Sequence, residues 1–176
     1  MLRVDELYAA GLAHGCQCTS YHFQLRSNQP FHCLQPKIMT PRILHYVWIG
    51  GGIKRPLHEK CISSWHRNLK DWEIIEWNDS NIDMNKARHI SRYFRTAYDN
   101  RIYEFIADYA RLVVLKEHGG VYVDTHIEIT RDFTPLLSDN FFIGMQFPDA
   151  RHSWALEGAV MCAPPDHPFI NEGHSD

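Results

Sequence analysis

The chain of 176 residues lacks any hydrophobic run close to the roughly 20 residues that a membrane-spanning helix needs. Its first residues, Met1 to Glu6, place acids where a secretory signal would have its apolar stretch. From these absences we expect no membrane-spanning segment. We also expect a cytosolic protein, unless the chain is a piece of a longer one.

Paired cysteines and a basic surface are missing as well. The five cysteines are odd in number and scattered, which excludes a disulfide framework. Cys16 and Cys18 lie near His14 and His22, and these residue types bind zinc, but the usual zinc-finger spacing is absent. Eighteen basic residues stand against 21 acidic ones, and the net charge of -3 gives no general attraction for nucleic acid. We therefore expect no nucleic-acid partner.

The composition that remains is typical of a globular protein, with 44% hydrophobic and 22% charged residues. The length suits one domain with its own hydrophobic core. Apart from a short helical stretch at 2–12, residues 1–40 show little periodicity. We predict an irregular lead-in over residues 1–40 and one domain over residues 41–176.

Hydrophobic periodicity in the predicted domain alternates between strand and helix. Strands are predicted at 43–49, 72–77, 121–129, 141–147 and 159–163, and helices at 56–69, 83–99 and 101–118. The first strand, helix and second strand form a βαβ unit, which implies parallel strands and a right-handed crossover. Gly119 and Gly120 end the last helix, because glycine accepts a left-handed cap. The pattern predicts an α/β fold.

The predicted strand over residues 121–129 carries a candidate metal site. Its alternation places Asp124, His126 and Glu128 on one face. A carboxylate and an imidazole two residues apart can ligate a divalent ion such as Mn²⁺, which stabilises charge on a phosphate leaving group. A polar, solvent-facing side of an edge strand explains the same pattern, and two ligands alone do not decide between these interpretations.

Two further features lie where parallel sheets bind ligands, at the mouth of the sheet. Asp108 and Arg111 are three residues apart on the predicted helix over residues 101–118, and an ordinary ion pair is the alternative interpretation. Trp48 comes shortly before three glycines, 50–52, which let a backbone approach a ligand closely. A tryptophan at such a strand end can stack on a nucleobase, and a core tryptophan is the alternative. The glycines do not form a phosphate-binding Walker loop, because no Gly-Lys-Ser/Thr follows.

Several segments, in order, resemble the glycosyltransferase family that carries the DXD sugar-binding motif. This family includes capsular-polysaccharide sugar transferases, yeast-type initiating mannosyltransferases (the GT32 type) and, more distantly, the clostridial glucosylating toxins. The matching segments are PRILHYVWIG (41–50), CISSW (61–65), WEIIEWN (72–78), ADYARL (107–112), Leu115 and GGVYVD (119–124). The resemblance covers roughly residues 41 to 170.

The resemblance implies a GT-A fold, a Rossmann-like α/β sandwich that binds a nucleotide-sugar with Mn²⁺ or Mg²⁺. It implies that Trp48 stacks on the donor base. Asp108 and Arg111 would hold the donor sugar and diphosphate, and Tyr122 would lie near the nucleotide. Asp124 matches the first acid of the DXD motif and would reach the ribose and the metal. The family transfers sugars with retention of configuration, and the resemblance identifies no catalytic base or nucleophile.

Two departures from the family pattern modify these expectations. His126 stands where the family has the aspartate that ligates the metal directly. We therefore take Asp124 and His126 as the metal ligands and expect weaker metal binding in acidic solution, because imidazole ligates a metal only when it is neutral. The chain also stops at Asp176, before the usual end of family members, so we expect a GT-A domain that is incomplete at its C-terminus.

The function expected is that of a hexosyltransferase. It would move a sugar from a UDP- or GDP-linked donor to a glycan or other hydroxyl acceptor, with the metal stabilising the diphosphate leaving group. The first alternative is a degenerate or truncated protein that binds a nucleotide-sugar with little turnover. The second is a metal hydrolase built on Asp124, His126 and Glu128, which needs a further histidine such as His118 or His152. A bacterial protein would be cytoplasmic, whereas a eukaryotic one would work in the Golgi lumen with a separate anchor.

Overall fold

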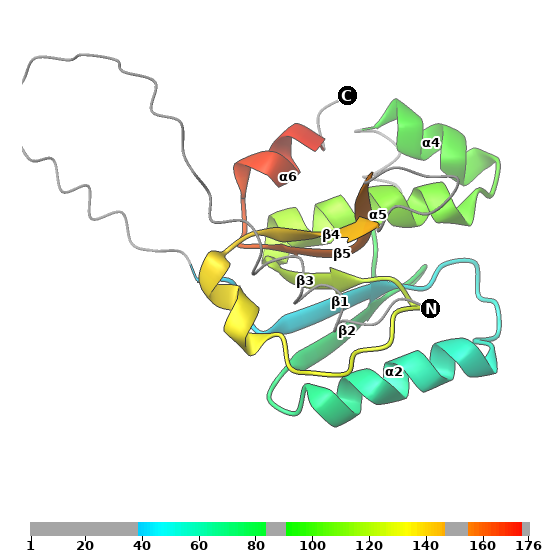
Figure 1. Ribbon diagram of the computed structural model, residues 1–176. Coiled ribbons are helices and arrows are strands. Elements are labelled where there is room, and N and C mark those ends of the chain that lie inside the picture. Colours follow the sequence, from blue (N-terminus) through cyan, green and yellow to red (C-terminus); the bar gives the residue numbers. More distant parts are fainter. Residues whose placement is uncertain (1–38, 84–90, 147–154, 174–176) are drawn as a thin grey trace, which may run out of the picture.

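Five strands form one mixed sheet within the residues that the computed structural model describes, which are 39–83, 91–146 and 155–173 (Figure 1). In chain order the strands are β1 (Ile43–Val47), β2 (Glu73–Trp77), β3 (Gly120–Val123), β4 (Phe142–Gln146) and β5 (Ala155–Ala163). Their spatial order is β2-β1-β3-β5-β4. β1 is parallel to both of its neighbours, whereas β5 is antiparallel to β3 and β4.

The parallel half of the sheet is built by the predicted βαβ unit. β1 leads into α2 (Pro56–Asn68), which returns the chain to β2. The register pairs Ile43 with Glu73 and Val47 with Trp77, so both strands end at the same edge. Pro56 occupies the first turn of α2, where its missing N–H costs no helical hydrogen bond.

Helices cover both faces of the sheet and make a three-layer sandwich (Figure 1). α2 covers one face, and the 3₁₀ helix η1 (Thr134–Asp139) contributes Leu137 to the same core. The other face carries α4 (Arg92–Asp99), α5 (Tyr103–His118) and α6 (Pro168–Gly173). The prediction of an α/β sandwich is confirmed.

The two hydrophobic cores follow from the alternation of side chains along the central strands. Leu44 and Tyr46 of β1 face α2 and pack with Trp65, which is fully buried. Val47 faces α5 and packs with Tyr122 of β3. Because both faces of β1 are covered, its sequence is apolar on both faces apart from the buried His45.

α5 ends at the glycine pair, as predicted. Gly119 has φ +64°, and its N–H donates to the carbonyl oxygen of Leu115 at 2.9 Å. Gly120 has φ +102°, and a Cβ atom there would lie 2.5 Å from the carbonyl oxygen of Ile43. Glycine therefore lets β3 start directly against β1, in parallel register.

The predicted strand over residues 121–129 is wrong in its second part, because β3 ends at Val123. The Asp124 N–H donates to a carbonyl oxygen of β5 at 2.8 Å, and the Ile127 N–H donates back to the Asp124 carbonyl oxygen at 3.0 Å. The chain therefore turns away from the sheet. Ile127 and Ile129 are buried in the core that α2 covers, and their apolar alternation imitates a strand.

α4 is shorter than the helix predicted over residues 83–99. The Ser91 hydroxyl accepts a hydrogen bond from the Phe94 N–H at 3.1 Å and caps the helix at this point. Residues 84–90 lie outside the described residues, as do the short helix predicted at 2–12 and the cysteines and histidines of residues 14–22. The domain boundary near residue 41 stays a prediction. In the described ranges, no helix is long and apolar enough to cross a membrane.

Candidate functional site

The C-terminal ends of β1, β2 and β3 meet at one edge of the sheet, at the right in Figure 1. The N-terminal end of α5 reaches the same edge, because α5 leads back to the start of β3. Trp48 and Asp124 directly follow β1 and β3, and Asp79 follows β2 two residues later. Parallel sheets bind ligands at this edge, so the candidate site lies here.

Arg111 joins two carboxylates at this edge. Its Nη2 atom pairs with Oδ1 of Asp108, one turn earlier on α5, and lies 3.7 Å from Oδ1 of Asp124. The guanidinium lies over the ring of Tyr122, 5.0 Å from the ring centroid. The Arg111 side chain is 12% exposed and that of Asp108 is 48% exposed. The guanidinium is therefore mostly buried, whereas the carboxylate paired with it faces solvent. The ion pair expected from the sequence is thus part of a larger cluster.

Tyr122 orients Asp124 in this cluster. Its hydroxyl donates a hydrogen bond to Oδ1 of Asp124 at 2.7 Å. Burial of the ring, together with the negative charge of Asp124, raises the pKa of Tyr122 well above its usual value. Tyr122 is therefore a neutral donor at physiological pH. The other oxygen of Asp124, Oδ2, has no partner among the described residues.

Gly158 of β5 makes room for the guanidinium. A Cβ atom at position 158 would collide with Nη1 of Arg111. The Nε atom of Arg111 is buried and has no hydrogen-bond partner within the described part of the chain. The cluster therefore contains a cation whose hydrogen-bonding capacity its two carboxylates do not fill, and a guanidinium is well suited to bind phosphate. Sequence reasoning missed Gly158, because no local pattern relates it to Arg111.

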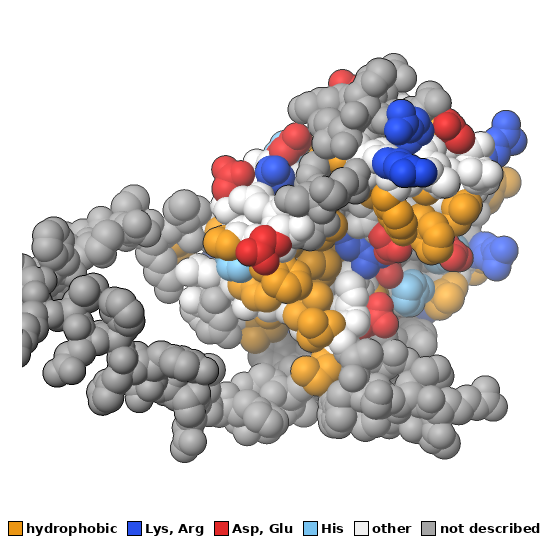
Figure 2. Space-filling model, turned by 90° about the horizontal axis from the view of Figure 1, so that it is seen from above, with side chains coloured by type: hydrophobic (Ala, Val, Ile, Leu, Met, Phe, Trp, Pro, Cys, Tyr) orange, Lys and Arg blue, Asp and Glu red, His pale blue; other side chains and the backbone are white. Residues whose placement is uncertain are grey.

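Aromatic side chains of α4 and α5 are exposed near this cluster. Figure 2 shows hydrophobic side chains exposed among acidic and basic ones on the face of the molecule that it presents. Tyr93 and Phe105 pack together with ring centroids 5.7 Å apart, and they are 47% and 43% exposed. Burial and, next, the charge of Asp108 raise the pKa of Tyr93, while Arg111 opposes this effect. Tyr93 therefore lies within the electrostatic reach of the cluster and gives it an apolar rim.

Trp48 lies on the α2 side of the same edge. Its side chain continues the alternation of β1 and packs against the core that α2 covers. The indole N–H donates to the carbonyl oxygen of Gly52 at 2.8 Å, and Lys54 lies over the ring, 5.2 Å from its centroid. His58 meets the ring edge-on, with centroids 4.9 Å apart. The glycine loop thus folds around Trp48, and its stacking on a base stays a prediction.

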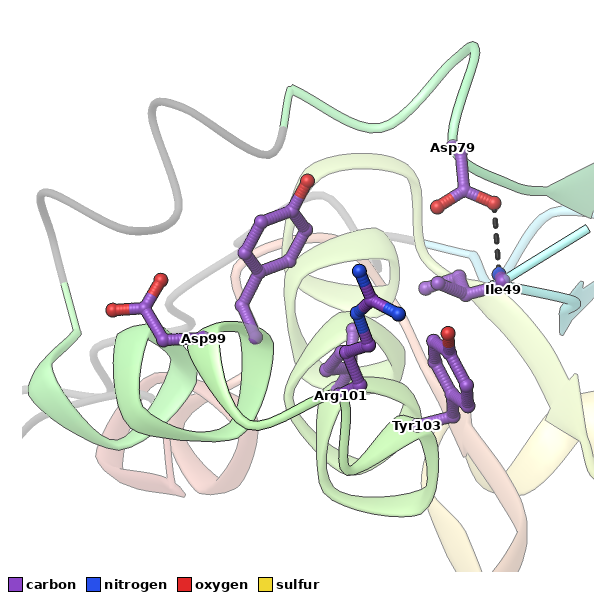
Figure 3. A pocket seen from close by; sticks show the side chains of 8 residues that line it. Ile49, Asp79, Asp99, Arg101 and Tyr103 are labelled. Carbon is purple, nitrogen blue, oxygen red and sulfur yellow. Dashed lines mark hydrogen bonds between the residues drawn. The ribbon is translucent and has the colours of Figure 1, made fainter.

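A pocket of about 340 Å³ opens on the α5 side of this edge (Figure 3). Ile49, Gly50, Asp79, Arg101 and Tyr103 contribute to its lining. The Gly50 N–H donates to Oδ2 of Asp79 at 2.8 Å and so joins the chain after β1 to the chain after β2. Sequence reasoning did not single out Asp79 or Arg101. A carboxylate just after a parallel strand is a signal for Asp79, whereas no local pattern marks Arg101.

Asp124, His126 and Glu128 do not share one strand face, because the chain turns after β3. His126 is exposed on this turn, and Glu128 pairs with Lys60 of α2 at 3.3 Å. Among the described residues, no three His, Cys, Asp or Glu side chains form a group that could hold a metal ion. The free Oδ2 of Asp124 nevertheless suits a Mg²⁺ or Mn²⁺ ion that takes further ligands from a bound diphosphate.

The histidines that a metal hydrolase would need are not brought to Asp124. His118 stacks on Trp77, with ring centroids 5.2 Å apart, and lies at the C-terminal end of α5, away from the site edge. His152 lies outside the described residues. The described residues thus supply no third ligand beside Asp124 and His126, so the hydrolase alternative depends on a ligand outside them, such as His152, and stays a prediction.

Comparison with known families places the cluster in a recognised region. Residues 56–143, half of the chain, match a family described as glycosyltransferase sugar-binding region containing DXD motif. The match includes α2, β2, α5 and β3, and therefore Asp108, Arg111, Tyr122 and Asp124.

Curated relatives carry names from the same class of enzyme. The chain is 28% identical over 139 residues to an uncharacterized glycosyltransferase, L373, of Acanthamoeba polyphaga mimivirus, covering 76% of the chain and 53% of that protein. It is 29% identical over 137 residues to inositol phosphoceramide mannosyltransferase 1 of Schizosaccharomyces pombe, covering 74% of the chain and 40% of that protein. Inositol phosphoceramide mannosyltransferase 3 of the same yeast is 25% identical over 154 residues, covering 85% and 38%. The chain spans about half of these relatives or less.

A solved structure shares the fold. The glycosyltransferase named PaToxG superposes with a TM-score of 0.54 at 15% identity, covering 77% of the chain and 59% of that structure. At this identity the likeness establishes the architecture, which is the GT-A type of α/β sandwich.

Proposed function

Because the chain belongs to the glycosyltransferase family with the DXD sugar-binding region, we propose that it transfers a hexose from a nucleotide-sugar to a hydroxyl acceptor. One observation carries the proposal, the cluster at the C-terminal edge of the parallel strands formed by Asp108, Arg111, Tyr122 and Asp124. It combines a sheltered cation, two carboxylates and a neutral hydroxyl donor. A sugar diphosphate offers the complementary groups, which are anionic oxygens and sugar hydroxyls.

Each member of the cluster has a role in this proposal. Arg111 attracts the diphosphate through the positive charge of its guanidinium. Asp108, which is half exposed, accepts hydrogen bonds from sugar hydroxyls. Tyr122 holds Asp124 in place, and Asp124 reaches the ribose and the metal. Trp48 stacks on the base from the α2 side of the edge. Holding the donor in one geometry supplies part of the rate enhancement, and the cation supplies another part by stabilising the departing diphosphate.

The proposal includes a divalent ion, Mn²⁺ or Mg²⁺, held by Asp124 and His126 together with the donor diphosphate. Such an ion supplies charge stabilisation for the leaving diphosphate. His126 is exposed in the turn that follows β3, so its imidazole is accessible to an ion bound beside Asp124.

The names of the yeast relatives suggest the sugar and the acceptor. Two of them are inositol phosphoceramide mannosyltransferases. We therefore take mannose as the first sugar to test and a phosphoinositol-bearing lipid as the first acceptor, ahead of a polysaccharide. Retention of configuration and membership of the GT32 type complete the proposal.

A second function is favoured by the residue at position 126. Imidazole in place of a carboxylate removes one negative charge from the expected metal site. This substitution favours a protein that binds a nucleotide-sugar with little or no turnover. Donor binding without donor hydrolysis identifies this case.

A thermal-shift screen tests donor binding. UDP, GDP and their common sugars are each measured with and without Mn²⁺ at neutral pH. A ligand that binds only the folded state raises the melting temperature, and at about 100 times its Kd it adds about 2.7 kcal/mol of stability. We expect a shift that needs one nucleotide and the metal together. The absence of a shift with every pair contradicts both donor binding and transfer.

Two variants assign the shift to the site. Asp124→Ala is expected to remove most of the metal-dependent shift. Glu128→Ala is the matched control, because this carboxylate also follows β3 but pairs with Lys60 on α2. His126→Asp is expected to lower the Mn²⁺ concentration that the shift requires. If the two substitutions at Asp124 and His126 leave the metal response unchanged, the metal site is elsewhere.

A further inference from the structure

The pocket beside the cluster is large enough to bind a small molecule. None of the four cluster residues, Asp108, Arg111, Tyr122 and Asp124, lines it. Its volume of about 340 Å³ falls in the range of small-molecule pockets, roughly 300 to 1,000 Å³. It lies between the chain that follows β1 and β2 and the connection from α4 to α5 (Figure 3). Its charged side chains are two carboxylates, of Asp79 and Asp99, and one guanidinium, of Arg101. Asp79 and Arg101 are not joined to each other by an ion pair.

Asp79 is held in position from one side only. Its Oδ2 accepts the Gly50 N–H at 2.8 Å, and the dashed line in Figure 3 marks this bond. Gly50 has φ +88°, and a Cβ atom there would lie 2.6 Å from the ring of Tyr103. The close approach of Tyr103 to the backbone therefore fixes the Gly50 N–H that holds Asp79. Oδ1 of Asp79 has no partner among the described residues, so it is left to accept a hydrogen bond from a ligand.

Arg101 approaches the pocket from the other element. It connects α4 to α5 with φ +56°, a left-handed conformation that a residue with a side chain adopts rarely. The Arg101 N–H donates to the carbonyl oxygen of Tyr98 at 3.1 Å, and the next N–H donates to Ala97 at 2.9 Å, which fixes this turn. The guanidinium points toward the space between Ile49 and Asp99 (Figure 3). It makes no hydrogen bond or ion pair with the described residues.

A carboxylate and a guanidinium on two sides of a pocket complement the guanine base. Guanine carries two neighbouring N–H donor groups, N1–H and the N2 amino group, and a carboxylate accepts from both. It also presents the acceptors O6 and N7, to which arginine binds with two hydrogen bonds. Uracil offers a carboxylate only one N–H, flanked by two oxygens that the carboxylate repels. Tyr103 provides an aromatic surface for a base in the same pocket.

We infer that this pocket takes the base of the donor and selects guanine over uracil, with Asp79 and Arg101 as the specificity-determining residues. The inference rests on the proposed function, because the base belongs to the nucleotide-sugar. The base then lies against Tyr103 on the α5 side of the edge, so that Tyr103 takes the stacking role expected of Trp48 on the α2 side. The diphosphate and sugar extend toward Arg111.

Isothermal titration of the whole chain in the presence of Mn²⁺ tests the preference without any variant. The probes are guanosine, inosine and uridine diphosphate, and inosine differs from guanosine only by the missing N2 amino group. We expect guanosine diphosphate to bind at least about tenfold more tightly than uridine diphosphate, with inosine diphosphate in between. Equal or tighter binding of uridine diphosphate overturns the inference, as does equal binding of inosine and guanosine diphosphates.

Two variants assign the preference to the pocket. Asp79→Asn keeps an oxygen for the Gly50 N–H but presents an amide donor to the base, so it is expected to shift the preference toward uridine diphosphate. Arg101→Asn removes the guanidinium, and asparagine tolerates the left-handed backbone. It is expected to reduce the preference for guanosine to about twofold. Arg95→Gln, which changes an exposed arginine of α4 outside the pocket lining, is the matched control and is expected to keep the full preference. A preference unchanged in both pocket variants overturns the inference.

The failures of the inference and of the proposed function are distinguishable. If uridine nucleotides bind tightly and their sugars are hydrolysed or transferred, the proposed function stands and the base assignment is wrong. If no nucleotide binds with or without Mn²⁺, both are overturned.

Discussion

At the scale of single residues, the cluster is defined by which charges have partners. Arg111 is paired with two carboxylates, yet its Nε–H is unused. Asp124 receives one hydrogen bond on Oδ1 and none from the described residues on Oδ2. The site therefore holds its own charges in place and keeps the Oδ2 acceptor of Asp124 for a ligand.

Tyr122→Phe is predicted to weaken metal-dependent nucleotide binding by about tenfold, because residues that orient a metal ligand typically contribute this much. The ring and its packing remain, and only the hydroxyl that donates to Asp124 is lost. Titration of Mn²⁺ in the presence of nucleotide measures the effect.

Tyr46→Phe is the matched control for this prediction. Tyr46 is also a buried tyrosine whose hydroxyl bonds a carboxylate, that of Glu76 at 2.5 Å, but it faces α2. Each variant is expected to lose about 1 kcal/mol of stability. Equal effects of the two variants on nucleotide binding would show that Tyr122 acts only through stability.

His45 is a buried titratable residue at the centre of the sheet. Its Nε2 lies 2.7 Å from the carbonyl oxygen of Gly119, and its Nδ1 lies 3.0 Å from the indole Nε1 of Trp77. An indole N–H only donates, so His45 is neutral with its proton on Nε2. Burial lowers the pKa of His45 from 6.5 to about 4, with a smaller contribution from His118.

The stability of the protein is predicted to fall as the pH falls from about 6.5 to about 4. In this range the unfolded chain binds a proton at residue 45 that the folded chain does not, because the pKa of His45 is lowered to about 4 on folding. The full contribution is present above pH 6.5, and about 3 kcal/mol is lost by pH 4. Urea unfolding at several pH values measures this loss.

Substitution of His45 separates its titration from that of other groups. His45→Gln is expected to flatten the pH dependence between about 4 and 6.5, at the cost of lower stability at neutral pH. His66→Gln, on the exposed face of α2, is expected to keep the wild-type pH profile. An unchanged profile in His45→Gln contradicts the assignment.

At the scale of elements, the short strand β3 decides where Asp124 lies. β3 has four residues and is bonded to β1 on one side and β5 on the other. It begins at Gly120, whose backbone runs against Ile43, and it ends where Asp124 turns out of the sheet. Only the few residues of β3 separate the close contact at Gly120 from the turn at Asp124. The strand therefore fixes the Asp124 carboxylate at the site edge.

Gly120→Ala is predicted to destabilise the protein by about 3 kcal/mol or more. The new methyl group would lie 2.5 Å from the Ile43 carbonyl oxygen, on a backbone with φ +102°. Gly52→Ala is the control, because a Cβ atom there meets nothing within 4 Å, and its effect is expected to stay within about 1 kcal/mol. Chemical denaturation compares the two. Similar stabilities would contradict the tight contact between β3 and β1.

At the scale of the whole molecule, the site edge has two sides. The pocket with Asp79 and Arg101 lies by the C-terminal ends of β1 and β2, and the Arg111 cluster lies by the C-terminal end of β3 and the first half of β5. α5 lines both, through Tyr103 near its start and Arg111 two turns later. An elongated ligand such as a nucleotide-sugar fits this arrangement better than a compact one.

Removal of residues 1–38 is predicted to leave a folded domain. Elements among the described residues, all of which follow residue 38, cover both faces of the sheet and form its cores. We expect the melting temperature to change by less than about 4 °C, which corresponds to about 1 kcal/mol for a chain of this size. Calorimetry of the full and shortened chains measures it, and a larger fall would place part of residues 1–38 in the folded domain.

Local sequence patterns alone determined the types and order of the main elements. The mostly apolar sequence of β1 reflects burial on both of its faces. The apolar stripe of α5 and the two glycines that end it reflect contacts within a few residues of the chain. The βαβ unit follows from their order. The same patterns brought Asp108 and Arg111 onto one helix and Asp124 to the end of the next strand, because these residues are near one another in the chain.

Only the tertiary structure decided where β3 ends and which residues meet across the site edge. Ile127 and Ile129 have strand-like alternation, but the chain turns away, because the Ile127 N–H bonds back to the Asp124 carbonyl oxygen and both isoleucines are buried under α2. Asp79 and Arg101 come together from β2 and the α4–α5 connection, with no local pattern that relates them. The physical reason is the same in both cases. Periodicity records how each segment buries its own side chains, whereas a strand end or a pocket depends on partners that lie far away in the sequence.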